Sequence, residues 1–435
     1  MSHTHPNSSS RLQVSAHWLR PLLPAAGGEA TLLIRLATTP DPAAERAAPL
    51  DVAFVLDRSG SMSGPKLTLA KEGVQLAMQR LRPVDRVALV IYDDSVEVMQ
   101  PLAAATPRLL TSLQRALSRL QSGGSTALFG GWVAGCGELA NAPAGDGAQT
   151  RIRRTILLTD GLANVGPRDP GELAQHAGQL RQRGIATTTV GVGLDYDEGL
   201  LSAMAEAGGG NFKYAESPQV LRTFFAEELQ QMLSIAAATT TLHLTLPQGV
   251  RGRLVSAFPV TRDGKTLKIA IGDLPDGETV DLVFTLRGVP GEVGDTLPVQ
   301  ASCHWTDPAT DQRHRWDVSP SPLWRATREE LAATRSEPWV EERVALQLAA
   351  AERREALELD RAGRFRESRA KMAMSVDYLM AAPDTDEVQE LRRESGELAA
   401  APPTAAYDSH TRKSAQYREH QRRHNRPTRP ADEPR

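Results

Sequence analysis

Cysteine is scarce in this chain, with only Cys136 and Cys303 among 435 residues. Two cysteines in different predicted domains cannot build a disulfide framework, which favours a reducing compartment. An excess of one charge is also lacking: the net charge of -3 excludes a polycationic nucleic-acid coat. No run approaches the ~20 apolar residues of a membrane-spanning helix, and the opening MSHTHPNSSSRLQ lacks the apolar core of a secretion signal. We therefore expect a cytoplasmic protein with no membrane span and no nucleic-acid partner.

Short apolar runs alternate with amphipathic stretches from Asp51 to Ile235. The runs DVAFVLD, RVALVIYDD, RTILLTD and IATTTVGVG do not alternate polar with apolar residues, so both faces of each strand should be buried. Between the first two runs, Leu67, Ala70 and Val74 recur at helical spacing. The pattern predicts an α/β fold with a doubly wound, mostly parallel sheet covered by helices.

Flanking this block, the pattern changes to strands separated by turn residues, as in TTTLHLTLPQGV and TLKIAIGDLPDGETVDLVFTLRG. Only two strands are expected before the α/β block, in RLQVSAHWL and ATLLIRLATT. Two strands cannot bury one face of a sheet by themselves, so we expect them to pair with the later strands. From Leu323, helical periodicity returns, and Gly363 separates two expected antiparallel helices. The predicted organisation is a disordered leader at 1–10, a split β-sandwich at 11–48 and 237–320, the α/β domain at 49–236, a helical hairpin region at 323–400 and a basic disordered tail at 401–435.

The stretch DVAFVLDRSGSMSGPKL ends a buried strand in a carboxylate followed by hydroxyls. A nucleophile elbow needs G-x-S-x-G, and GSMSG places Met62 at the serine position. A phosphate loop needs Gly-Lys followed by Ser or Thr, whereas here Pro65 precedes Lys66 and removes a backbone N–H. A metal site is the third interpretation, and it predicts further ligands elsewhere in the chain.

Oxygen atoms from several loops must converge to hold a hard divalent ion such as Mg²⁺. The carboxyl ends of parallel strands bring distant loops together. Two expected strands end in an aspartate, hydroxyls follow the first of them, and GGSTALFGG supplies a threonine between flexible glycines. The predicted metal ligands are Asp57, Ser59, Ser61, Thr126 and Asp160.

With these residues in place, the sequence resembles the von Willebrand factor type A (VWA) domains, which include the integrin inserted domains. DRSGS matches the family's D-x-S-x-S, and Thr126 and the aspartate of TDG match the rest of its metal-ion-dependent adhesion site (MIDAS). The resemblance covers about Leu50 to Ile235, and bacterial cytosolic proteins with this domain inside a sandwich look similar.

The resemblance implies a non-enzymatic protein–protein interaction module. In the family, hydroxyls touch the ion directly and an acidic side chain of the partner, Asp or Glu, completes its coordination. The expected cofactor is Mg²⁺, with Mn²⁺ or Ca²⁺ as alternatives that oxygen ligands also serve. The closing helix can slide in the family, and here it leads into the first sandwich strand, AAATTTLHLTL, which suggests coupling to the sandwich.

Two other functions stay open at this stage. Magnesium chelatases pair a similar domain with a ring ATPase, so the chain could be an accessory subunit of a machine whose ATPase is a separate protein. A metal-dependent hydrolase is disfavoured because no acid/base pair is visible.

Simpler structural roles also remain for these carboxylates. Asp57 and the serines could cap a helix, and Asp160 could begin a turn. Further loop carboxylates could hold a second ion, although no hydroxyl cluster accompanies them and solvated turns are expected instead; they are Asp93, Asp94, Asp195 and Asp197.

Overall fold

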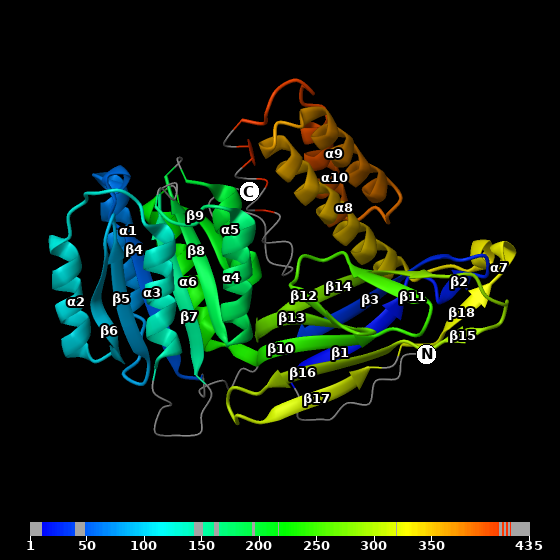
Figure 1. The fold of residues 1–435 in the computed structure, drawn as a ribbon, viewed down its shortest axis with the longest axis horizontal. Helices are drawn as coiled ribbons and strands as arrows, with labels where there is room; N and C mark the ends of the chain where they lie inside the picture. Colours follow the sequence, from blue (N-terminus) through cyan, green and yellow to red (C-terminus); the bar gives the residue numbers. More distant parts are fainter. Residues whose placement is uncertain are drawn as a thin grey trace.

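The computed structural model describes most of the chain, and Figure 1 shows its α/β domain, sandwich and helical region. The described residues are 11–39, 48–142, 151–160, 165–193, 196–215, 217–318 and 320–408, together with Thr411, Arg412, Ala415 and Arg418. The predicted leader at 1–10 lies outside them. Among the described residues, no helix is both long enough and apolar enough to cross a membrane.

The α/β domain is built on one central sheet. Its strands are β4 (Leu50–Asp57), β5 (Arg86–Tyr92), β6 (Val96–Ala104), β7 (Ile152–Thr159), β8 (Ile185–Val192) and β9 (Gly209–Ala215). Their order is β6-β5-β4-β7-β8-β9, and all neighbours are parallel except β5 and β6. Every residue of β4 is buried, as its unbroken apolar sequence predicted for a strand covered on both faces.

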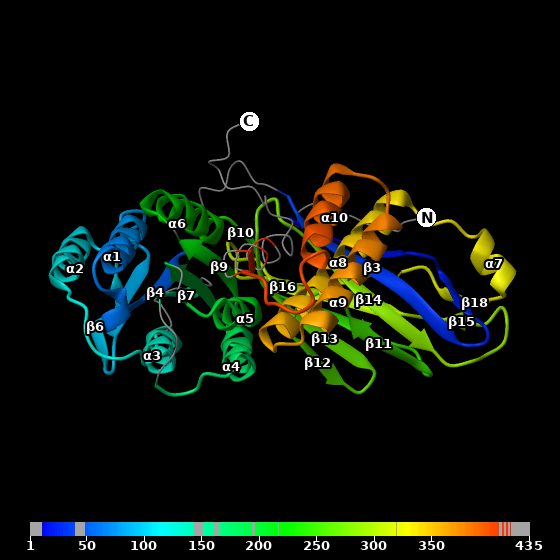
Figure 2. The ribbon, with the colours of Figure 1, turned by 90° about the horizontal axis from the view of Figure 1, so that it is seen from above.

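Helices cover both faces of this sheet (Figure 2). One face is covered by α1 (Pro65–Met78), α2 (Pro107–Arg119) and α6 (Pro218–Leu233), and the other by α3 (Leu128–Ala140), α4 (Pro170–Gln182) and α5 (Glu198–Gly208). Ser217 caps α6, since its side chain accepts a hydrogen bond from the Val220 N–H. The fold-class prediction of a mostly parallel α/β sheet is therefore confirmed.

A buried polar network fixes α6 to the sheet. Glu228 on α6 accepts hydrogen bonds from Arg154 Nη1 at 2.8 Å and Thr188 Oγ1 at 2.6 Å, and the Asn211 amide donates to its other oxygen. Burial alone would raise the pKa of Glu228, but the Arg154 charge and these donors outweigh it and lower the pKa. Because β10 begins at Ile235, α6 leads directly into the sandwich.

The sandwich combines strands that precede the α/β domain in the sequence with strands that follow it. One sheet has the order β1-β3-β14-β11 and the other β12-β13-β10-β16-β17, so N-terminal strands pair with late ones as predicted. A small third sheet has the order β15-β18-β2. The strands are β1 (Leu12–Trp18), β2 (Leu22–Pro24), β3 (Gly28–Thr38), β10 (Ile235–Thr245), β11 (Val250–Leu254), β12 (Val260–Asp263), β13 (Thr266–Pro275), β14 (Thr279–Gly288), β15 (Thr296–Leu297), β16 (Gln300–Thr306), β17 (Arg313–Val318) and β18 (Leu323–Ala326).

The C-terminal region contains one more long helix than the expected hairpin. Its helices are α7 (Arg328–Ala333), α8 (Pro338–Arg361), α9 (Phe365–Met380) and α10 (Asp386–Ala399). The turn between α8 and α9 lies at Gly363, whose φ of 73° explains the glycine. Leu323, expected to begin the helical region, instead begins β18, because it pairs with Leu297 of β15 and the residues that follow it pair with β2. Val340 and Val344 of α8 pack on Leu33 and Val283 of the sandwich.

Part of the predicted disordered tail is ordered. Tyr407 and Ala415 are buried in a cluster with α8–α10 residues, and the Tyr407 hydroxyl donates to the Leu398 carbonyl at 3.1 Å. Arg412 pairs with Glu198 of the α/β domain. For these residues the prediction of a disordered tail is wrong, because apolar burial and ion pairs hold them. Residues 419–435 lie outside the described part of the chain.

Candidate functional site

Two of the predicted ligands follow neighbouring parallel strands. Asp57 is the last residue of β4, and Asp160 comes directly after β7, which pairs with β4 in register. Both residues are fully buried, at 0% exposure. Their strand ends lie at the edge of the sheet away from the sandwich (Figure 1). The fold therefore brings two buried carboxylates to the same edge, as the sequence predicted.

The serines lie on a tight turn after β4. Ser59 precedes the short 3₁₀ helix η1 (Gly60–Met62), and the buried Met62 anchors this turn in the core. The Ser59 N–H donates to Asp57 Oδ1 at 2.8 Å, and the hydroxyl oxygens of Ser59 and Ser61 are 3.2 Å apart. No side-chain cap is formed at the start of η1 or of α1. The interpretation of this motif as a side-chain helix cap is therefore wrong.

Asp57 is held by Thr159, a residue that was not among the predicted ligands. The Thr159 hydroxyl donates to Asp57 Oδ2 at 2.6 Å. Burial raises the pKa of Asp57, and the nearby charge of Asp160 raises it further, against the hydrogen bonds from Thr159 and Ser59. The negative charge of Asp57 is therefore disfavoured unless a cation lies nearby. Thr159 had a weak signal in the sequence, as the residue beside the TDG aspartate at the end of a buried strand.

Asp160 is contacted by both a hydroxyl and a cation. Its Oδ1 accepts from Ser61 Oγ at 2.8 Å, and its Oδ2 accepts from Lys66 Nζ at 2.5 Å. In the sequence, Lys66 bears only on the failed match to a phosphate loop, and no local pattern predicts it at this site. The ion pair adds a cationic side chain from α1 to the predicted constellation.

Backbone hydrogen bonds bring the threonine loop beside the serine turn. The Gly60 N–H donates to the Gly124 carbonyl at 3.0 Å, and the Gly123 N–H donates to the Arg58 carbonyl at 2.9 Å. Gly124 has a φ of 74°, which accounts for glycine at this crossing. Thr126 is buried, and its hydroxyl makes no hydrogen bond to the other four residues within the described chain.

Two of the other four loop carboxylates have structural roles. Asp93 is buried rather than solvated; its Oδ1 accepts from Ser95 and its Oδ2 pairs with Arg58 at 2.9 Å. Asp197 caps α5 by accepting the Gly199 N–H. Asp94 is exposed, as expected, and Asp195 lies outside the described residues.

The donor set suits a hard divalent cation. Carboxylate and hydroxyl oxygens are what Mg²⁺, Mn²⁺ and Ca²⁺ prefer. Within the described ranges, no group of three or more His, Cys, Asp or Glu could hold a metal ion, so a site here depends on hydroxyls. The close oxygens of Asp57, Ser59, Ser61 and Asp160 meet that requirement. The assignment of these residues and Thr126 as ligands stays a prediction.

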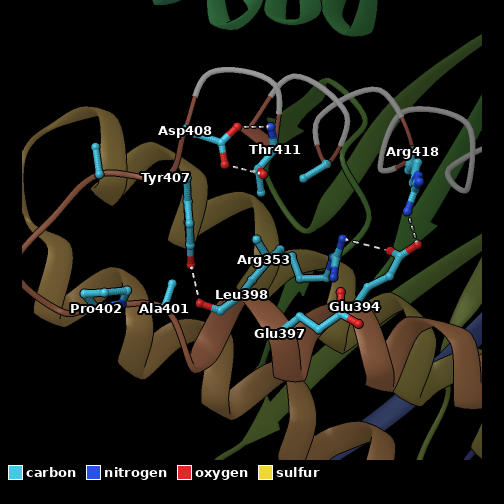
Figure 3. A pocket seen from close by; sticks show the side chains of 12 residues that line it. Arg353, Glu394, Glu397, Leu398, Ala401, Pro402, Tyr407, Asp408, Thr411 and Arg418 are labelled. Atoms are coloured by element: carbon cyan, nitrogen blue, oxygen red, sulfur yellow. Dashed lines mark hydrogen bonds and ion pairs between the residues drawn. The ribbon is translucent and has the colours of Figure 1, made fainter.

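A cavity of about 500 Å³ lies elsewhere, between α10 and the chain that follows it (Figure 3). Its charged groups largely satisfy one another. Arg353 Nη1 donates to Ser395 Oγ at 2.8 Å, and Glu394 pairs with Arg353 at 3.4 Å and with Arg418 at 2.7 Å. This internal pairing makes the cavity a weaker candidate than the carboxylate site.

Comparison with known proteins supports the fold. The sequence model of the von Willebrand factor type A domain matches residues 51–227. The chain is 30% identical over 221 residues to the uncharacterized protein YfbK of Escherichia coli, covering 50% of this chain and 37% of that protein. It is 26% identical over 281 residues to the uncharacterized protein sll0103 of Synechocystis, covering 62% and 64%. The chain thus spans less than two thirds of the length of either relative.

A solved structure resembles almost the whole chain. The von Willebrand factor type A protein from Catenulispora acidiphila superposes with a TM-score of 0.73, covering 96% of this chain and 99% of that one. The identity is 20%, so this likeness supports the fold alone.

Proposed function

We propose that this chain, which belongs through residues 51–227 to the von Willebrand factor type A domains, binds a partner protein through a divalent cation. Domains of this family are in general protein-interaction modules. The residues proposed to hold the cation, Mg²⁺ in the first instance, are Asp57, Ser59, Ser61, Thr126 and Asp160. A bound Mg²⁺ would supply a Lewis-acidic coordination position that a partner's Asp or Glu carboxylate fills.

The observation that carries this proposal is the meeting of two fully buried carboxylates with two serine hydroxyls at one sheet edge. Burying like charges together is costly unless cations compensate them, and Lys66 supplies one positive charge for the two carboxylates. The Ser61 hydroxyl reaches Asp160 from a residue 99 positions away, which ties the first loop to the end of β7. Hydrogen bonds within the chain therefore orient these oxygens toward one another.

We also propose that the chain is not an enzyme and acts in the cytoplasm. The described contacts of the Ser59 and Ser61 hydroxyls are to each other, to Asp57 and to Asp160, rather than to an imidazole that could act as a general base. Ser59 is buried, which further restricts attack on a substrate.

The test is metal-dependent stabilisation of the full chain. A ligand at 100 times its Kd stabilises the folded state by about 2.7 kcal/mol, so Mg²⁺ should raise the Tm of the wild type. Asp57→Asn should abolish the increase. Asp94→Asn is the matched control, because it removes an exposed carboxylate from the adjoining loop. Equal stabilisation of wild type and Asp57→Asn by Mg²⁺ would exclude this site.

The second arm measures the partner. Proteins captured on the immobilised chain with Mg²⁺ should be released by EDTA and lost with Asp57→Asn but kept with Asp94→Asn. Replacing the acidic residue that cross-links near Ser61 in the captured protein should also abolish binding. A partner retained equally by wild type and Asp57→Asn would contradict a metal-bridged contact.

A further inference from the structure

We propose that Lys66 is an internal competitor for the candidate metal site: its ammonium group takes the carboxylate of Asp160 and must be moved or outweighed before a divalent cation binds. The inference deepens the proposed function and rests on it. It concerns how tightly the site holds metal, and so how much the interaction depends on the metal concentration.

The contact is close and involves a buried partner. Lys66 Nζ lies 2.5 Å from Asp160 Oδ2, and the side chain of Asp160 is 0% exposed while that of Lys66 is 27% exposed. The other oxygen of the same carboxylate is taken by Ser61. Both oxygens of Asp160 are therefore engaged, one of them by a full positive charge.

The local helix does not favour this lysine. Lys66 is the second residue of α1, where the positive end of the helix dipole disfavours a cation. The ion pair with Asp160 offsets that cost. A lysine at this position is thus explained by the site rather than by the helix.

A glycine just after a separate strand makes room for the lysine side chain. Gly193 follows β8, and a Cβ built on it would lie 2.9 Å from Lys66 Cε. The Cβ of any other residue at this position would clash with the Lys66 side chain and force it to shift. Gly193 also has a φ of 79°, so the same position needs glycine for its backbone.

Lys66 should weaken metal binding whether it leaves Asp160 or stays beside it. If Lys66 leaves Asp160, its ion pair is lost; if it stays, the divalent cation sits beside a like charge. Both effects weaken metal binding relative to a neutral side chain of similar length. Lys66→Met should therefore bind Mn²⁺ more tightly than the wild type, by about tenfold or more.

The experiment is calorimetric titration of the full chain with Mn²⁺, and with Mg²⁺ in parallel. Lys66→Met and Lys66→Gln are compared with Arg80→Met, which removes the same charge from the exposed residue just beyond the far end of α1, roughly 20 Å along the helix. We expect both Lys66 variants to bind more tightly and Arg80→Met to match the wild type. Equal or weaker binding by both Lys66 variants overturns the inference while leaving the metal site intact. Absence of binding in the wild type and in every variant overturns the proposed function and this inference together.

A second measurement needs no substitution. Mn²⁺ should change the rate at which an amine-reactive reagent modifies Lys66, as read by mass spectrometry, by about threefold or more. Lys71 on the same helix is the internal control, because its ammonium donates to the Leu120 carbonyl away from Asp160. A Lys66 rate that is unchanged at saturating Mn²⁺ contradicts displacement, and the titration then decides between repulsion in place and no competition.

Discussion

Replacing Glu228 on α6 tests how the α/β domain is held at its junction with the sandwich. Its side chain is 0% exposed, and the carboxylate accepts hydrogen bonds from Arg154, Thr188 and Asn211. Glu228→Gln substitutes an NH₂ group for one oxygen, so a donor faces a donor whichever way the amide turns. Removing one partner of a buried ion pair costs about 3–5 kcal/mol, and we expect the lower end because one acceptor is kept.

The assay is urea denaturation of the full chain followed by circular dichroism, with hydrogen exchange of α6 amides as a local readout. Glu227→Gln is the matched control, because the neighbouring carboxylate is exposed and its loss should change stability by less than about 0.5 kcal/mol. A double replacement, Arg154→Met with Glu228→Met, should recover most of the loss, because it leaves no unpaired buried charge. Unfolding of Glu228→Gln and Glu227→Gln at the same urea concentration would refute the reasoning.

The pH dependence provides an independent check. The pKa of Glu228 is lowered from its ordinary value, despite burial, by Arg154 and the hydrogen-bond donors. Below the ordinary pKa, the unfolded chain therefore binds more protons at this group than the folded chain does. The stabilising contribution is complete above the unfolded pKa and is lost as the pH falls through the folded pKa. The difference between wild type and Glu228→Gln should accordingly be largest near neutral pH and shrink in acid.

Further predictions concern packing and the two thiols. A Cβ on Gly135 would lie 2.3 Å from Val55 Cγ2, so Gly135→Ala should shift α3 from β4 and cost about 1–3 kcal/mol in urea denaturation. Gly137→Ala, which meets nothing within 4 Å, is its control. Burial raises the pKa of Cys136 and of Cys303 to about 12, so neither thiol should react with a thiolate-specific reagent near pH ~8 until urea unfolds the chain. Rapid labelling of either cysteine in the folded protein would contradict its burial.

The parts of the fold that were predictable have strong local patterns. Four strands of the central sheet are runs of buried residues, and a run without alternation has few other structures available to it. Helix α10 was missed because its sequence, DEVQELRRESGELA, is mostly polar and places only Val388, Leu391 and Leu398 at helical spacing toward the core. Its packing on α8 and α9 supplies the stability that the sequence pattern does not reveal.

The residues around the candidate site also divide into those with a local sequence signal and those whose role depends on a contact distant in sequence. Asp57 and Asp160 were found because each ends an apolar run, which is a local signal. Lys66 has no comparable local signal. It lies at the site through its contact with Asp160, which is 94 positions away in the sequence. A cation near the start of a helix was the available signal, since the helix dipole disfavours it there. The unfavourable position of Lys66 is explained only once its partner, Asp160, is known. The pairing of β4 with β7 brings Asp160 to the loop that follows β4. If the titration gives the expected result, this lysine at the start of α1 also sets how tightly the neighbouring loop holds a metal.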